Sequence, residues 1–183
     1  MIEIRLHGYG GEGVVTMASL LAAAALKTDR KVQALPSFGV ERRGAPVVAA
    51  VRISDQEILM RSQSYEPDLV LVLNIKLLDV AKMQGICDNS LIILNAKESD
   101  EIPAEYQKWP LKKIDLTGIA LSEDLIIRGV PSINIPSFGA LCAVLEIPLE
   151  KTMATICEKW PGQIGQRNAE VAAVAYKQMV ERG

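Results

Sequence analysis

The feature that most constrains the fold is the run Leu-Val-Leu-Val-Leu at residues 69–73, which follows Asp68 and ends at Asn74. A strand with one face in water alternates apolar and polar residues. A continuous apolar run is instead typical of a central strand in a parallel sheet covered on both faces. The run Leu-Ile-Ile-Leu at residues 91–94, which ends at Asn95, has the same character. The two runs therefore predict a parallel sheet with a helical layer on each side.

The segments around these runs alternate between strand-like and helix-like patterns. Residues 2–6 alternate like a strand, and residues 14–26 follow as a helix whose second half is apolar on every side. Further strands are expected at residues 31–35, 46–53 and 112–116, and residues 57–60 are expected to pair with the strand at 46–53 as a hairpin. A short helix is expected at residues 76–83 and a surface connection at residues 96–110. This order predicts an α/β fold with a single doubly wound, mostly parallel sheet and helices on both faces.

The C-terminal third contains helical patterns and no strong strand pattern. Helices are expected at residues 137–145, after Pro148, and at residues 168–180, where Asn168 is expected to cap the first turn. A chain of 183 residues is long enough to bury a core and short enough to form one domain. Residues 1–183 are therefore interpreted as a single domain with a helical C-terminal third.

The composition argues against several functional classes. The formal net charge is −2 and no run of Lys and Arg forms a basic stripe, so nucleic-acid binding is not expected. No uncharged stretch is long enough to cross a membrane, and the N-terminus lacks the pattern of a signal peptide. The three cysteines form no CxxC pair and the chain has one histidine, which is too few ligands for an iron–sulfur cluster or a structural zinc ion. These features predict a cytoplasmic protein that binds no metal of its own.

A glycine-rich turn follows the first expected strand and matches the pattern G-x-G-x-x-G as Gly8, Gly10 and Gly13, with Gly11 between them. Glycines permit a tight turn and a close ligand approach, and the free N–H groups at the start of the next helix favour an anion such as phosphate. Glu12 opposes this interpretation, because a carboxylate there would repel a phosphate. The alternative is that the glycines only allow the strand and the helix to pack closely.

A second polar segment follows the strand expected at residues 31–35 and contains Ser37, the adjacent pair Arg42 and Arg43, and Gly44. No acidic residue ends that strand, although an NAD site normally has one there to hold the ribose. The two arginines could clamp a phosphate or a carboxylate of a partner. If the first two strands are parallel, this loop lies beside the glycine turn at the carboxyl end of the sheet.

The alternative for the arginine loop is a solvated surface segment, or arginines paired with Glu41 and Glu12.

Asn134 lies between strand-like and helix-like regions, where it could cap a helix or bind a ligand, and capping is the commoner role. His7 precedes the glycine turn and is interpreted as structural, because no nucleophile, base and acid can be assembled around the only histidine.

Several of these segments together resemble a known family. They are Gly-Tyr-Gly-Gly-Glu-Gly at residues 8–13, Pro-Ser-Phe-Gly-Val-Glu-Arg-Arg-Gly-Ala-Pro at residues 36–46, Pro-Asp-Leu at residues 67–69, and Asn134 ahead of Gly-Ala-Leu at residues 139–141. Their order is similar to that in the gamma subunit of pyruvate and 2-oxoglutarate ferredoxin oxidoreductases, over nearly the whole chain. Two positions depart from that pattern, since the family usually has glutamine in place of Glu12 and glycine in place of Ala45.

The resemblance implies a non-catalytic gamma subunit of a complex that decarboxylates a 2-oxoacid, reduces ferredoxin and forms an acyl-CoA. It implies alpha and beta partner subunits, with a delta subunit as a further candidate, and places thiamine diphosphate and the iron–sulfur clusters on those partners. Coenzyme A is the one ligand to which this chain could contribute. The residues expected in such a site are Gly8, Gly10, Gly11, Glu12, Gly13, Ser37, Arg42, Arg43, Gly44 and Asn134.

Three alternatives remain open from the sequence. The chain could be a small dinucleotide-binding redox protein, a scaffold that binds no small molecule, or the related subunit of indolepyruvate ferredoxin oxidoreductase. The apolar stretch at residues 20–26 adds one further expectation, which is that the isolated chain self-associates or exposes a large apolar patch.

Overall fold

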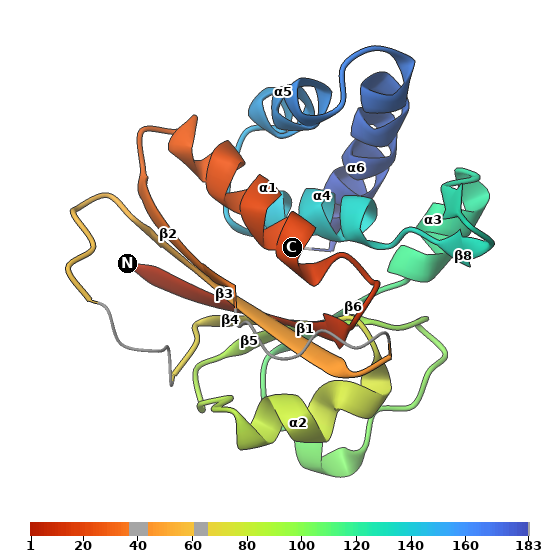
Figure 1. Cartoon of the computed structure of the whole chain (residues 1–183). Helices are drawn as coiled ribbons and strands as arrows, with labels where there is room; N and C mark the ends of the chain where they lie inside the picture. Colours follow the sequence, from red (N-terminus) through yellow and green to blue (C-terminus); the bar gives the residue numbers. More distant parts are fainter. Residues whose placement is uncertain (37–43, 61–65, 183) are drawn as a thin grey trace.

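The computed structural model describes residues 1–36, 44–60 and 66–182, which form a six-stranded sheet between helical layers (Figure 1). The strand order is β2-β3-β1-β4-β5-β6. The strands span Ile2–Tyr9 (β1), Lys31–Pro36 (β2), Pro46–Ser54 (β3), Leu69–Val72 (β4), Leu91–Asn95 (β5) and Leu111–Ile114 (β6). A separate two-stranded hairpin consists of β7 (Ile126–Ile127) and β8 (Val130–Pro131).

The centre of the sheet is parallel, as the two apolar runs predict. Strand β4 pairs in parallel with β1 on one side and with β5 on the other, and β5 pairs in parallel with β6. All four residues of β4 are buried. Both faces of this strand are therefore covered, which confirms the inference from residues 69–73.

Strand β3 is the exception in this mostly parallel sheet. It runs antiparallel to β1, with Tyr9 opposite Pro46, and antiparallel to β2 on its other side. Because β1 and β2 occupy both edges of β3, no edge remains for the hairpin partner expected at residues 57–60, and that prediction is wrong. These four residues form no helix or strand.

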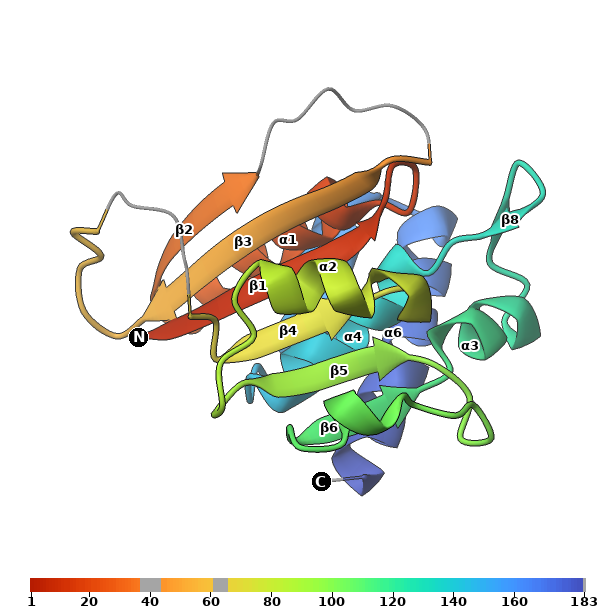
Figure 2. The same cartoon turned by 90° about the horizontal axis from the view of Figure 1, so that it is seen from below.

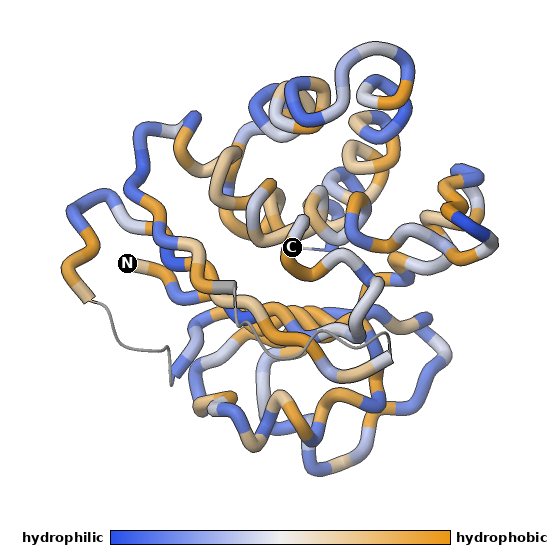
Figure 3. The backbone as a smooth tube through the Cα atoms, viewed as in Figure 1, coloured by the Kyte–Doolittle hydropathy of each residue, from blue (hydrophilic) through white to orange (hydrophobic). Residues whose placement is uncertain are grey.

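Helices cover the two faces of the sheet unequally. One face carries α1 (Val14–Leu26) and α4 (Asn134–Val144), with α5 (Leu149–Lys159) and α6 (Gln163–Glu181) beyond them (Figure 1). Figure 2 shows α2 (Leu78–Met83) lying across the opposite face, near the 3-10 turns Ile75–Leu77 and Ala104–Tyr106. Apolar residues concentrate along the strands and at the inner sides of the helices, and hydrophilic residues at the outer loops (Figure 3).

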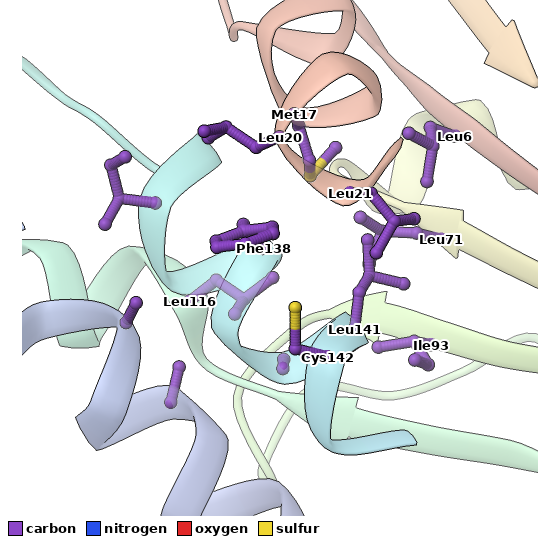
Figure 4. Packing of buried hydrophobic residues seen from close by; sticks show 14 of the residues in the cluster. Leu6, Met17, Leu20, Leu21, Leu71, Ile93, Leu116, Phe138, Leu141 and Cys142 are labelled. Carbon is purple, nitrogen blue, oxygen red and sulfur yellow. The ribbon is translucent and has the colours of Figure 1, made fainter. Parts of the chain in front are cut away.

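The larger core lies between the sheet and the helices α1, α4 and α6. Figure 4 shows Leu21 of α1, Phe138 and Leu141 of α4, and Leu71 of β4 converging there. A smaller core under α2 includes Tyr106 and Trp109, which are 1% and 6% exposed. The expectation of a plain surface connection at residues 96–110 is therefore wrong in part, because these two aromatic side chains fold back onto the sheet.

The predicted end of one strand, at residue 116, and the predicted start of one helix, at residue 168, are also wrong. Strand β6 ends at Ile114, and Asp115 then caps an unpredicted helix, α3 (Leu116–Ser122), by accepting a hydrogen bond of 2.7 Å from the Gly118 N–H. Helix α6 begins at Gln163 after Gly162, so Asn168 lies inside it, 8% exposed, and does not cap it. Apolar spacing marks the face of a helix more reliably than it marks its first turn.

The apolar stretch at residues 20–26 is mostly covered. Leu20, Leu21, Ala24 and Ala25 are buried in the larger core, whereas Leu26 is 58% exposed. Because α4 and α5 pack against α1, this stretch does not form the large exposed patch that its composition suggests.

Candidate functional site

A cleft of about 1050 Å³ lies at the carboxyl end of β1, where the glycine turn leads into α1. One wall is the turn itself with the first residues of α1, a second comes from the start of β3, and the third comes from the hairpin β7–β8 and the start of α4. The residues that line it are Tyr9, Gly10, Gly11, Glu12, Gly13, Val14, Val15, Thr16, Gly44, Val47, Thr117, Ile127, Arg128, Val130, Pro131, Ser132, Ile133 and Asn134.

The glycine turn is shaped by close contacts and by a left-handed backbone. A Cβ atom on Gly8 would stand 2.6 Å from the Val14 side chain, so Gly8 lies beneath the turn and does not line the cleft. Gly13 has φ 77° and caps α1 without a side chain, and a Cβ there would meet Asn134 at 2.9 Å. Glycine at these positions lets β1, α1 and α4 approach one another closely.

Glu12 folds back onto the end of β1. Its Oε2 accepts a hydrogen bond of 2.6 Å from the Tyr9 N–H, while the Glu12 N–H bonds to the Tyr9 carbonyl at 3.0 Å. Burial raises the pKa of the Glu12 carboxyl, and the Tyr9 N–H opposes that shift. The carboxylate therefore has a local partner, and its charged form is disfavoured where the sequence alone suggested a full negative charge.

The end of the loop that contains the arginine pair meets the glycine turn. The Gly10 N–H donates to the Ala45 carbonyl at 2.8 Å, and the Gly44 N–H donates to the Gly10 carbonyl at 3.3 Å. Gly44 thus lies at the cleft, as expected. Ser37, Arg42 and Arg43 lie outside the described residues, so their place in the site stays a prediction.

The third wall contains a cation that the sequence analysis missed. In the hairpin β7–β8, Ile127 pairs with Val130 across a two-residue turn. The turn residues Arg128 and Gly129 have φ 53° and 78°, and positive values at both are typical of a type I′ turn. The sequence signal was weak, because Gly129 alone fits such a turn and Arg is not among the residues that usually precede glycine there.

Asn134 lies directly beside Gly13 at the end of the glycine turn. It is the first residue of α4, which has no side-chain cap, so the expectation that Asn134 caps a helix is wrong. Its Oδ1 instead accepts a hydrogen bond of 2.7 Å from the Ser132 hydroxyl. Thr117 lines the cleft on the same side. Its hydroxyl accepts a hydrogen bond of 3.0 Å from the Asn95 side-chain amide, which fixes its position.

Two features of the cleft favour an anion, and they oppose the carboxylate of Glu12 in its lining. Helix α1 points its N-terminus into the cleft, with no acidic residue in its first turn and no side chain that caps its free N–H groups. Such a terminus carries a partial positive charge, and Arg128 adds a full one at the opposite wall. No group of three or more His, Cys, Asp or Glu that could hold a metal ion occurs in the described parts of the chain. The described lining residues suit phosphate binding, and they include one carboxyl group, that of Glu12, with no histidine, lysine or second carboxyl to pair with it.

His7 lies in β1 outside the cleft, as a structural residue would. Its side chain is 1% exposed, and neither ring nitrogen has a hydrogen-bond partner among the residues that the structure describes. Burial, helped by the nearby Arg5 guanidinium, lowers the pKa of His7 to about 4. The ring is therefore neutral at pH 7 and has no access to the cleft.

Comparison with known proteins identifies the family. Residues 3–178 match the family model described as pyruvate ferredoxin/flavodoxin oxidoreductase. The chain is 44% identical, over 98% of both chains, to the pyruvate/ketoisovalerate oxidoreductases common subunit gamma of Thermococcus kodakarensis. It is 41% identical to the pyruvate synthase subunit PorC of Methanocaldococcus jannaschii, over 100% of this chain and 99% of the relative.

Solved structures agree with the family match. The pyruvate oxidoreductase subunit PORC of Thermotoga maritima superposes with a TM-score of 0.77 at 32% identity, over 96% of this chain and 95% of that one. The 2-oxoglutarate:ferredoxin oxidoreductase of Magnetococcus marinus shares the fold, with a TM-score of 0.83 at 19% identity, and this chain covers 31% of that longer chain. None of the described helices is both long and apolar enough to span a bilayer. The chain therefore belongs to the pyruvate ferredoxin/flavodoxin oxidoreductase family, as the gamma subunit of a 2-oxoacid:ferredoxin oxidoreductase.

Proposed function

We propose that this gamma subunit performs no chemistry alone and that, in the assembled complex, its cleft holds a phosphate group of coenzyme A. The observation that carries the proposal is the convergence of the uncapped N-terminus of α1, the glycine turn and Arg128 on one cleft. Coenzyme A carries several phosphates, which are the anions that helix termini and arginine side chains bind best. The Magnetococcus marinus relative was solved with coenzyme A and succinyl-CoA bound.

The division of labour in the complex is part of the same proposal. Thiamine diphosphate and the iron–sulfur clusters belong to alpha and beta subunits, and a delta subunit where one is present, because this chain offers no cluster ligands in its described parts. Cys87, Cys142 and Cys157 are all free thiols, which suits the reducing cytoplasm in which we place the complex. Co-purification from the native host, followed by identification of the accompanying chains, tests the partners directly.

A charge reversal tests the coenzyme A site. In the reconstituted complex, Arg128→Glu is expected to raise the KM for coenzyme A by about tenfold, since a lost charge-assisted hydrogen bond costs roughly 1.5–3 kcal/mol. The KM for the 2-oxoacid should not change. The matched control is Lys177→Glu, an exposed residue of α6 that does not line the cleft. An equal effect of both substitutions, or none of Arg128→Glu, would count against phosphate binding in this cleft.

The rival activity, that of a small dinucleotide-binding redox protein, has weaker support. Strand β2 ends in Leu35-Pro36 with no acidic residue to hold a ribose, although the turn after β1 has the glycine spacing of such sites. Titration of the isolated chain with NAD and NADP by calorimetry distinguishes the two proposals. Tight dinucleotide binding by the chain alone would favour the rival.

A further inference from the structure

Strand β2 forms an open edge of the sheet. Its inner side pairs with β3 over all six residues from Lys31 to Pro36, and no described strand lies on its outer side (Figure 2). An edge strand presents a row of backbone N–H and C=O groups that can pair with another chain. Lys31 and Ala34 are exposed along this edge.

The other edge of the sheet is protected. Strand β6 has only four residues, two of which are Lys112 and Lys113. The Arg182 guanidinium at the end of α6 donates to the Lys113 carbonyl at 2.8 Å, and the Lys113 ammonium is held by the Glu98 and Asp100 carbonyls. Short length, lysines and a covering helix end are the usual means of preventing edge pairing, and β2 has fewer of them.

Exposed aliphatic residues flank β2. A groove of about 410 Å³ runs along its first half and is lined by Leu26 at the end of α1 and by Glu57, Ile58 and Leu59 after β3. Leu26 is 58% exposed and Leu59 is 84% exposed. A strand added to β2 would therefore gain backbone hydrogen bonds from the edge and apolar contact beside it, which is how strand addition provides affinity and register.

We infer that β2 is an edge-to-edge pairing surface whose occupant is the β2 strand of a second copy of this chain. In an antiparallel arrangement about a twofold axis at Gln33, Val32 faces Ala34 of the other copy and Lys31 faces Leu35. Lys31, the one charged residue of β2, thus lies opposite Leu35 and not opposite Lys31 of the other copy, so no like charges face each other.

Gln33 suits the position on the axis. Its Oε1 accepts a hydrogen bond of 3.0 Å from the Arg52 guanidinium, and its NH₂ group bonds to none of the residues that the structure describes. An amide oxygen accepts two hydrogen bonds, so each of two facing Gln33 side chains can donate to the other and keep its Arg52 contact. A second copy needs no complementary charge at this edge, since Lys31 is the one charged side chain that β2 itself presents.

The test uses the full chain in sedimentation velocity over a concentration series, with hydrogen exchange as the structural readout. The wild type is expected to dimerise, and amide protection at residues 31–36 should rise with concentration. Ala34→Lys places two ammonium groups in the pairing and should weaken the dimer by at least about tenfold, in line with the cost of edge lysines. Ala23→Lys, at an exposed alanine of α1, is the matched control and should leave the dimer intact.

Several results would overturn the inference. One is a chain that stays monomeric well above the micromolar range, and another is a dimer that Ala34→Lys does not weaken. A monomeric chain whose Ala34→Lys variant fails to bind partner subunits would mean that a strand of another subunit occupies the edge. Circular dichroism of both variants shows whether the fold is retained, and because Ala34 is exposed we expect no change.

Discussion

Glu12 is the one acidic residue of the glycine turn at residues 8–13, whose other members are glycines and Tyr9. Its carboxylate accepts the Tyr9 N–H at the edge of the cleft, and burial raises its pKa. A raised pKa means that the folded chain keeps a proton at a pH where the unfolded chain has lost it. Stability is then highest below the unfolded value and falls as pH rises through the folded value.

Glu12→Gln should remove this share of the pH dependence. A glutamine oxygen can still accept the Tyr9 N–H, but it has no charge that burial disfavours. We expect the free energy of unfolding to decline less between pH 4.5 and pH 7 in the variant than in the wild type, as measured by urea denaturation at each pH. Glu170→Gln, at an exposed position of α6, is the control and should follow the wild type. A variant with the same decline as the wild type would show that Glu12 is not responsible.

The candidate site was predictable from residues only in part. Gly10, Gly11, Gly13 and Asn134 were all expected near a ligand, and the structure brings them to one cleft. Arg128 was not, because its place depends on a two-residue hairpin that packs beside a turn more than 100 positions earlier in the sequence. Local pattern identifies which residues can turn tightly, but tertiary packing decides which of them face each other.

At the element scale, the helices α4 and α6 cross with almost no space between their backbones. A Cβ atom on Gly139 would stand 2.0 Å from the Ala172 carbonyl oxygen, which no side-chain rotation can relieve. Both residues lie in the larger core and Ala172 is fully buried. The crossing therefore depends on the absence of a single methyl group.

Gly139→Ala is expected to destabilise the chain by about 1–3 kcal/mol, the usual cost of overpacking a well-packed core. The better helix propensity of alanine, worth up to about 1 kcal/mol, offsets only part of that cost. Urea denaturation measures the difference. Ala154→Ser adds one atom to an exposed position of α5 and should change stability by less than about 0.5 kcal/mol. A Gly139→Ala variant as stable as the wild type would mean that the two helices can move apart freely.

The strands themselves were easier to predict than the direction in which they pair. The apolar runs of β4 and β5 identified buried parallel strands, because burial on both faces leaves a continuous pattern. The same reasoning did not show that β3 is antiparallel, since side-chain alternation is the same in both directions and the pairing partners are distant in sequence. Helix α3 was missed because its apolar residues continue directly from β6, and only the Asp115 cap separates the two.

At the scale of the whole molecule, the described residues form a core and a cleft at the end of β1, and they assemble no catalytic group. The only histidine is buried in the sheet and neutral at pH 7, and Cys142 is buried with its pKa raised to about 12, so neither offers a reactive form. Two-electron oxidation of a 2-oxoacid needs a group that stabilises a carbanion and an acceptor for the electrons. This chemistry supports the proposal that partner subunits supply both.

The isolated chain is therefore expected to show no 2-oxoacid oxidation when assayed with thiamine diphosphate, coenzyme A and an artificial electron acceptor. The same preparation, mixed with the partner subunits, should restore turnover, which shows that the chain is folded and competent to assemble. Omitting only this chain from the mixture should then reveal its contribution, and we expect the dependence on coenzyme A to change more than the dependence on the 2-oxoacid. Turnover by the chain alone at about 1 per second or more, a rate typical of enzymes, would contradict its assignment as a non-catalytic subunit.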